Sequence, residues 1–168
     1  MTEYKELQMD IIPHKIDLGG EINLILGQTH FIKTASDLAG IVASCVPGVK
    51  FAVIFNEASG PCLIRTEGNS ESLIEKGVAI MKEIASGHTF LILLENAFPI
   101  NILTKVKLCD EVCCIYAATA NPLTVLTVNN EIGAGIIGVI DGESPKGVEN
   151  EDDKAARKAF LQKIGYAF

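Results

Sequence analysis

The chain has 168 residues, of which 48% are hydrophobic and 21% charged, and its formal net charge at pH 7 is −7. This composition is typical of one globular domain with its own core, and the acidic balance argues against binding to nucleic acids or anionic membranes. No apolar run is long enough to cross a membrane and no targeting segment is visible, so we expect a cytoplasmic protein.

The first third of the chain predicts two strands and a helix. Residues 9–17 indicate an edge strand, because their proline lacks the N–H that a central strand needs. The apolar run 22–27 is typical of a buried strand. A helix should then begin near Thr34, which forms a capping-box pattern with Asp37, and end at the following Pro-Gly pair.

The middle of the chain predicts strands separated by helices. Apolar residues recur at helical spacing from Leu73 to Ala85, Ser70 is placed to cap this helix, and Gly87 lies where a left-handed C-terminal cap is expected. A short helix should begin at Pro99. The expected strands are 51–55, 61–66 and 88–95.

The last third predicts a strand at 111–118, a hairpin of 122–128 with 135–140, a polar loop, and a helix from about 152 to 164. Strands alternate with helices in the middle and hairpins occur at both ends. The fold class we predict is therefore α/β, a layered single domain over residues 1–168 with a mixed β-sheet flanked by helices.

Polar side chains follow most of the expected buried strands, which is where open α/β sheets bind ligands. Each of them is also an ordinary turn residue, so their concentration carries more weight than any single one. The set includes Gln28, Thr29, His30, Asn56, Glu57, Asn101, Thr119, Asn121 and Asp141.

The three histidines differ in their sequence contexts. His30 follows a strand and precedes a helix start, where free N–H groups stabilise anions, although a half-buried structural histidine fits equally well. His88 begins its strand, the wrong end in a parallel sheet but an acceptable one if the strand is reversed. The preceding Gly87 either lets a ligand approach closely or caps the helix. His14 is expected to be exposed and has no assigned role.

Several common kinds of site are not supported. The segment "GAGIIG" has dinucleotide-fingerprint spacing but lies within an expected strand, and no P-loop or nucleophile elbow occurs. The five cysteines are interpreted as small buried residues, because those near Cys113 lack a second pair at zinc-site spacing.

Long segments of the chain, taken together, resemble the adenosine-specific kinase family, a small single-domain family found mainly in archaea. These segments are "GQTHFIKT", "FNEASGPCLIRTEGN", "SGHTFLILLENAFPINIL", "EVCCIYAATANPLTVL" and "GIIGVIDGESPKGVE". The resemblance extends from about Gly27 to Phe168. It implies an α/β domain that forms a homo-oligomer, with a trimer suggested, that binds adenosine or AMP and carries a stable phosphohistidine.

The resemblance also implies roles for individual residues. His88 and His30 both lie in family motifs, and both remain candidates for the phosphorylated residue. Lys33, Arg65 and Lys146 are candidate phosphoryl-oxygen donors, and the cofactor would be ATP or another phosphoryl donor, with Mg²⁺ as a candidate metal. The implied substrate-binding residues are Asn56, Glu57, Asn101, Thr119, Asn121, Asp141 and Lys146.

Two further points are left open at this level. The competing function is a non-catalytic oligomeric sensor of adenine nucleotides, which the lack of a P-loop favours. The polar segment that begins at Gly142 is expected to be a mobile loop that closes over nucleotide, with Lys146 on the phosphate; a plain solvated loop is the alternative.

Overall fold

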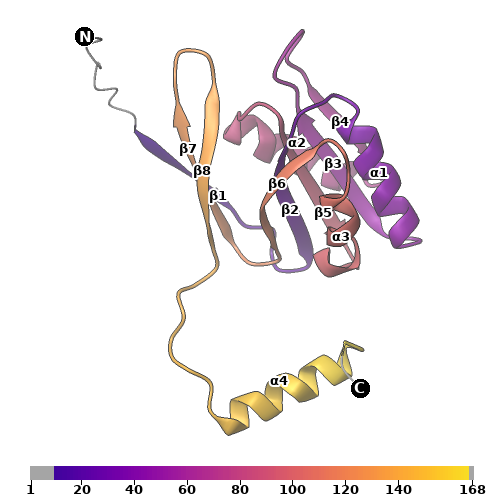
Figure 1. Ribbon diagram of the computed structural model, residues 1–168, viewed down its shortest axis with the longest axis vertical. Helices are drawn as coiled ribbons and strands as arrows, with labels where there is room; N and C mark the ends of the chain where they lie inside the picture. The colour runs from indigo at the N-terminus through magenta and orange to yellow at the C-terminus, as the bar shows by residue number, and fades with distance from the viewer. Residues whose placement is uncertain (1–9, 167–168) are drawn as a thin grey trace.

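A computed structural model describes residues 10–166 of the chain, which form two β-sheets and flanking helices (Figure 1). The large sheet has five strands in the order β4-β3-β5-β2-β6, and the small sheet has three in the order β1-β7-β8. The strands are β1 (Ile11–Ile16), β2 (Ile22–Thr29), β3 (Lys50–Asn56), β4 (Ile64–Gly68), β5 (Thr89–Glu95), β6 (Val112–Thr119), β7 (Leu123–Asn129) and β8 (Ala134–Asp141).

Four α-helices and one 3₁₀ turn complete the fold, and the predicted α/β class is confirmed. They are α1 (Thr34–Cys45), α2 (Glu71–Ile84), η1 (Pro99–Asn101), α3 (Leu103–Lys107) and α4 (Glu151–Lys163). The expected edge position of the first strand is also confirmed, since β1 borders the small sheet.

The predicted mixed sheet is wrong in one respect, because all strand pairs within the two sheets are antiparallel. The crossover through α1 does make β2 and β3 run in the same direction. However, β5 enters between them and pairs antiparallel with both. A parallel crossover therefore exists in the chain without creating a parallel pair, which strand patterns alone do not reveal.

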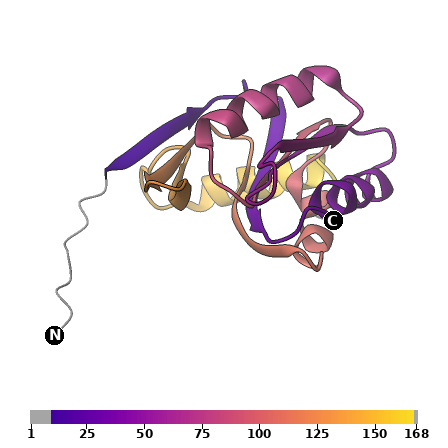
Figure 2. The same ribbon diagram turned by 90° about the horizontal axis from the view of Figure 1, so that it is seen from above.

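Both faces of the large sheet are covered, which explains its continuous apolar strands. Alternate side chains of β2 point to opposite faces: Leu24 and Leu26 join a cluster with α2 and the small sheet, whereas Ile25 joins a cluster with α1 and α3. Figure 2 shows α2 and α1 on opposite sides of the sheet. The fully buried strands fix the positions of the loops at the two ends of the sheet.

The end of the large sheet at which β2 and β3 finish is called here the histidine end. Because the pairing is antiparallel, β4, β5 and β6 begin at this same end. His88 directly precedes β5 and His30 directly follows β2, so both lie at the histidine end. The sequence argument that a reversed strand would bring His88 among the other strands' ends is thus confirmed.

Two predicted helix caps differ in the structure. Thr34 is the first residue of α1 rather than its cap, and its hydroxyl donates to the Phe31 carbonyl at 2.5 Å. Ala85, not Gly87, has the left-handed backbone at the end of α2, with φ of 51°. A Cβ at position 87 would lie 2.8 Å from the Ala58 Cβ, so close packing explains this glycine.

His14 is buried, which corrects the expectation that it is exposed. Its exposed fraction is 8%, and its Nε2 lies 2.8 Å from the Thr127 hydroxyl. The residues are 113 positions apart in sequence, and the pairing of β1 with β7 brings them together. His14 is therefore a structural residue of the small sheet.

The C-terminal helix α4 follows a long connection and lies apart from the rest of the chain in Figure 1. None of the residues of α4 is buried. Just beyond the helix, the Tyr166 hydroxyl accepts a hydrogen bond from Asn101 Nδ2 at 2.9 Å.

Candidate functional site

The histidine end brings together four of the predicted site residues: His30, Asn56, Glu57 and His88. The backbone N–H of His88 donates to the Asn56 carbonyl at 2.8 Å, and the His88 carbonyl accepts from the Thr29 N–H at 2.8 Å. The sheet ladder therefore continues through His88 and fixes its position between the ends of β2 and β3.

The other predicted residues lie at the opposite end of the sheet. Asp141 Oδ1 accepts from the Thr119 hydroxyl at 2.8 Å and from Asn121 Nδ2 at 3.0 Å. Asn101 is held separately, where its Oδ1 accepts from the Phe98 N–H. Lys146 is 82% exposed and pairs with Glu143 in the connection after β8.

The two groups cannot form one site within a single chain. β2 has eight residues and spans the sheet from one end to the other, which corresponds to roughly 25 Å at about 3.3 Å per residue. The groups can meet only if two copies of the chain bring opposite ends together.

A pocket of about 490 Å³ lies at the histidine end, and we call it the hairpin pocket because the tip of the β7–β8 hairpin forms one wall. Ala134 at this tip makes a parallel bridge with Ser86, which joins the small sheet to the segment after α2. The pocket is lined by Asn56, Glu57, Ala58, Cys62, Leu63, Ile64, Met81, Lys82, Ala85, Gly87, Ile132, Gly133 and Ala134.

Unusual backbone conformations gather around the hairpin pocket. Cys62 and Ala85, which line it, each have φ of 51°, and the adjacent His88 has φ of 54°. Residues with side chains rarely adopt this region, and such positions cluster at functional sites because the surrounding structure must hold them. Three of the four non-glycine residues with positive φ among residues 10–166 are in this small region.

His88 directly follows Gly87, which lines the hairpin pocket, and is not itself among the lining residues. Its half-buried ring stacks on the buried Phe55 ring, with centroids 6.0 Å apart and an interplanar angle of 15°. Within residues 10–166 the structure records no hydrogen bond to either ring nitrogen of His88. The stacking fixes one face of the ring and leaves its nitrogens available.

Glu57 and Arg65 hold the loop between β3 and β4. Glu57 accepts from the Leu63 N–H at 3.1 Å and from Arg65 Nη2 at 3.1 and 3.2 Å. The hydrogen bond from Leu63, followed by that from Arg65, lowers the pKa of Glu57 below its usual value. Glu57 is therefore a poor general base, and Arg65 is already paired with a carboxylate.

Lys82 is a cation of the pocket that the sequence analysis missed. It is exposed, lines the hairpin pocket, and makes none of the ion pairs recorded for residues 10–166. The signal that could have indicated it is its place in the last turn of α2, six residues before His88. From sequence alone, a lysine in a helix is normally interpreted as a solvent-exposed surface residue.

His30 has a different environment. It is exposed, and its Nε2 lies 3.3 Å from the Asp110 carbonyl oxygen. The nearby Lys33 ammonium pairs with Asp37 and lies 3.1 Å from Glu111 Oε1. Lys33 is thus paired with two carboxylates rather than oriented toward a phosphoryl group.

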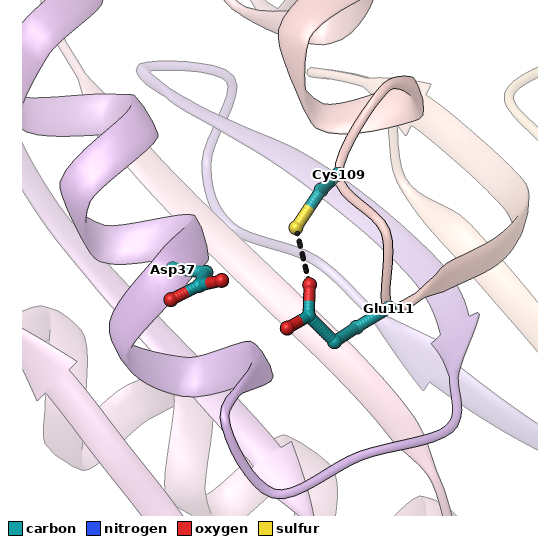
Figure 3. Close-up of side chains that lie close together, drawn as sticks. All are labelled: Asp37, Cys109 and Glu111. Carbon is teal, nitrogen blue, oxygen red and sulfur yellow. Dashed lines mark hydrogen bonds between the residues drawn. The ribbon is translucent and has the colours of Figure 1, made fainter.

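The side chains of Asp37, Cys109 and Glu111 lie close together, as Figure 3 shows. The Cys109 thiol donates to buried Glu111 at 3.0 Å, and this bond, with Lys33, lowers the pKa of Glu111 to about 2. Burial, followed by Glu111, raises the pKa of Cys109 to about 11.

The ligand atoms of these three residues lie within 4.8 Å of one another, as a metal site would require. The Lys33 ammonium already pairs with both carboxylates, however, and a thiol is a poor ligand for Mg²⁺. The arrangement is best described as an ion network that anchors the turn bearing His30 to the start of β6.

Comparison with known proteins supports the resemblance found in the sequence. The family model described as adenosine specific kinase matches residues 14–167. The chain belongs to the adenosine-specific kinase family. A crystal structure of the PH1918 protein from Pyrococcus horikoshii is 36% identical in sequence and has a TM-score of 0.90, covering 96% of this chain and 99% of that chain.

No curated protein matches the chain. Among residues 10–166, none of the helices has both the length and the apolar character needed to cross a membrane.

Proposed function

We propose that this member of the adenosine-specific kinase family is a phosphotransferase that binds adenosine or AMP in the hairpin pocket and works through a phosphohistidine at His88. The observation that carries the proposal is the position of His88, whose neighbour Gly87 lines the pocket. Neither histidine is itself a lining residue, but His30 also lacks a lining neighbour, since Thr29 and Phe31 are not part of the pocket.

The hairpin pocket suits a nucleoside. Its volume of about 490 Å³ is within the range of roughly 300–1,000 Å³ that small-molecule sites occupy. Leu63, Met81 and Ile132 provide apolar walls for a planar base, while Asn56 and Lys82 provide polar groups. Such a combination of apolar walls and few polar groups favours binding of one ring in one orientation.

The proposed chemistry has two steps. A ring nitrogen of His88 attacks the phosphorus of ATP or another phosphoryl donor, the bond to the leaving group breaks, and the other ring nitrogen gives up its proton. A hydroxyl of the nucleoside then attacks the phosphorus, the P–N bond breaks, and imidazole regains a proton. Lys82 would stabilise the phosphoryl oxygens, and Mg²⁺ would add positive charge on the donor.

The test is phosphoryl labelling followed by intact-mass measurement at neutral pH and after mild acid. The parent protein, His88→Gln and His30→Gln are incubated with labelled ATP and Mg²⁺, then chased with adenosine. We expect acid-labile label on the parent and on His30→Gln, none on His88→Gln, and transfer to adenosine. Labelling of His88→Gln at the level of the parent would refute the role of His88.

One observation favours the alternative function of a non-catalytic sensor. Lys33, Arg65 and Lys146 are each paired with carboxylates, so Lys82 is the cation that the hairpin pocket offers to a phosphoryl group. A sensor would bind adenosine or AMP and take up no label at any of the histidines. The labelling experiment therefore separates the two functions.

We also propose that the protein is a homo-oligomer, with a trimer as the suggested state. Helix α4 buries none of its residues and exposes 58% of Phe160. A helix of 13 residues is marginal alone in water, so it needs a surface to pack on. Strand β8 is an edge strand that exposes Ile137 and Ile140 by 53% and 55%. A second copy would cover both features.

A further inference from the structure

Asn56 is the last residue of β3, and its side chain lines the hairpin pocket. Only 7% of the residue is exposed. Its backbone carbonyl accepts the hydrogen bond from the His88 N–H. Asn56 is thus directly connected to the proposed phosphorylated residue.

The orientation of the Asn56 amide is fixed by its neighbours. Nδ2 donates to the Met81 carbonyl at 3.0 Å and to the Ser86 carbonyl at 3.1 Å, at the end of α2. Carbonyl oxygens only accept hydrogen bonds, so turning the amide over would place Oδ1 against two acceptors and lose both bonds. Both Nδ2 hydrogens are therefore used within the protein, and the amide cannot turn over to exchange Nδ2 and Oδ1.

The Oδ1 atom of Asn56 is buried and has no hydrogen-bond partner among residues 10–166. A buried acceptor without a donor is unfavourable and needs an explanation, such as a ligand that supplies the donor. At this position the protein offers an acceptor only. A donor from outside the protein, either a ligand group or a water molecule, would satisfy it.

We propose that Asn56 Oδ1 accepts a hydrogen bond from the exocyclic 6-amino group of the adenine base, and so selects adenine over 6-oxopurines. This inference rests on the proposed binding of adenosine in the hairpin pocket. The 6-amino group donates, whereas the 6-oxo group of guanine or hypoxanthine accepts and would face Oδ1 with two acceptors opposed. A buried group of fixed polarity discriminates strongly because the wrong base leaves it unpaired.

The experiment measures dissociation constants of adenosine, purine riboside and inosine by calorimetry. Purine riboside differs from adenosine only in lacking the 6-amino group. We expect purine riboside to bind about tenfold or more weakly, which corresponds to about 1.4 kcal/mol, and inosine to bind at least as weakly. In Asn56→Ala the ratio of adenosine to purine riboside affinity should fall close to one.

Asn69→Ala is the matched control, since this asparagine also holds backbone groups through its side-chain amide but lies beside the start of β3, away from the hairpin pocket, and should leave the ratio unchanged. Asn56→Ala also removes both bonds to the end of α2, so its folding is checked by circular dichroism. If that variant does not fold, the three ligands on the parent protein still test the inference, because equal affinities would overturn it.

Equal affinity of the parent for adenosine and purine riboside would overturn the inference and leave the proposed function intact. A preference for adenosine over purine riboside that persists in Asn56→Ala would have the same consequence. A ribose hydroxyl as the donor to Oδ1 would give this same equal affinity. Absence of binding by all three nucleosides would overturn both the inference and the proposed adenosine site. Normal adenosine selectivity without labelling of His88 would refute only the phosphotransfer.

Discussion

Replacing Gly87 by alanine tests how the hairpin pocket is built. The new Cβ would lie 2.8 Å from the Ala58 Cβ and 3.5 Å from the Ala58 Cα. Since non-bonded carbons prefer about 3.5–4.0 Å, the loop carrying Ala58 must move by about 1 Å. Overpacking of this kind costs about 2 kcal/mol, which for a chain of this size lowers the melting temperature by about 4–8 °C.

The clash involves one pair of methyl groups, so it can be relieved from the other side. In Gly87→Ala combined with Ala58→Gly, the remaining contact is an ordinary one at 3.5 Å, and most of the stability should return. Gly40→Ala is the control, because a Cβ at position 40 in α1 would meet nothing within 4 Å. That substitution should raise stability by up to about 1 kcal/mol, as alanine favours helices over glycine.

The assay is thermal and urea unfolding of the parent, the two single variants at 87 and 58, the double variant and the control. Retained stability of Gly87→Ala would refute the close-packing explanation. Equal loss in Gly87→Ala with and without Ala58→Gly would also refute it, because a purely backbone requirement at 87 is insensitive to the side chain at 58.

Three further predictions concern other parts of the molecule. The pKa of Glu111 is about 2 in the folded protein, below its ordinary value, so its stabilising contribution is present above about pH 4.5 and is lost as pH falls toward 2. Urea unfolding at several pH values should show that the free energy of unfolding falls less steeply with decreasing pH for Glu111→Gln than for the parent or for the exposed control Glu131→Gln. An equal pH dependence in all three proteins would contradict this. Lys82→Ala should weaken AMP binding by about tenfold or more and adenosine binding little, because a charge-assisted hydrogen bond to the phosphate is lost. Calorimetry on Lys82→Ala and Lys146→Ala checks this. Weaker AMP binding by Lys146→Ala alone would contradict binding of the phosphate in the hairpin pocket. Light scattering should give a multiple of the 18.0 kDa chain mass for the parent and lower masses for Ile137→Lys and Phe160→Asp, with the exposed Leu108→Lys as control, whereas a parent of single-chain mass would exclude the oligomer.

The elements of the fold follow from the sequence far better than their pairing does. The apolar runs that form β2, β3 and β5 are long and end at clear turn residues, so the strands were predictable. Their spatial order was not, because β5 pairs between β2 and β3 through contacts that are distant in sequence. The same reason hides the burial of His14, whose partner Thr127 comes from the other half of the chain.

The candidate site was predictable only in part. Polar residues after strands were the right kind of signal, and His30, Asn56 and Glu57 do gather at one end of the sheet with His88. Asn121 follows β6 and Asp141 ends β8, yet both lie at the other end of the sheet. In an antiparallel sheet, neighbouring strands finish at opposite ends. Lys82 carries no sequence signal of its own, since its role depends on the hairpin that closes over the end of α2.

The bridge between Ser86 and Ala134 makes one wall of the hairpin pocket belong to the small sheet. Opening the pocket by that wall means separating the hairpin from the end of α2, a local opening whose free energy depends on how firmly β1, β7 and β8 hold together. A ligand in the pocket would oppose this opening and slow amide hydrogen exchange along β8 and β7. Substitutions in β1, at the far edge of the small sheet from β8, would then alter nucleoside affinity without touching the nucleoside.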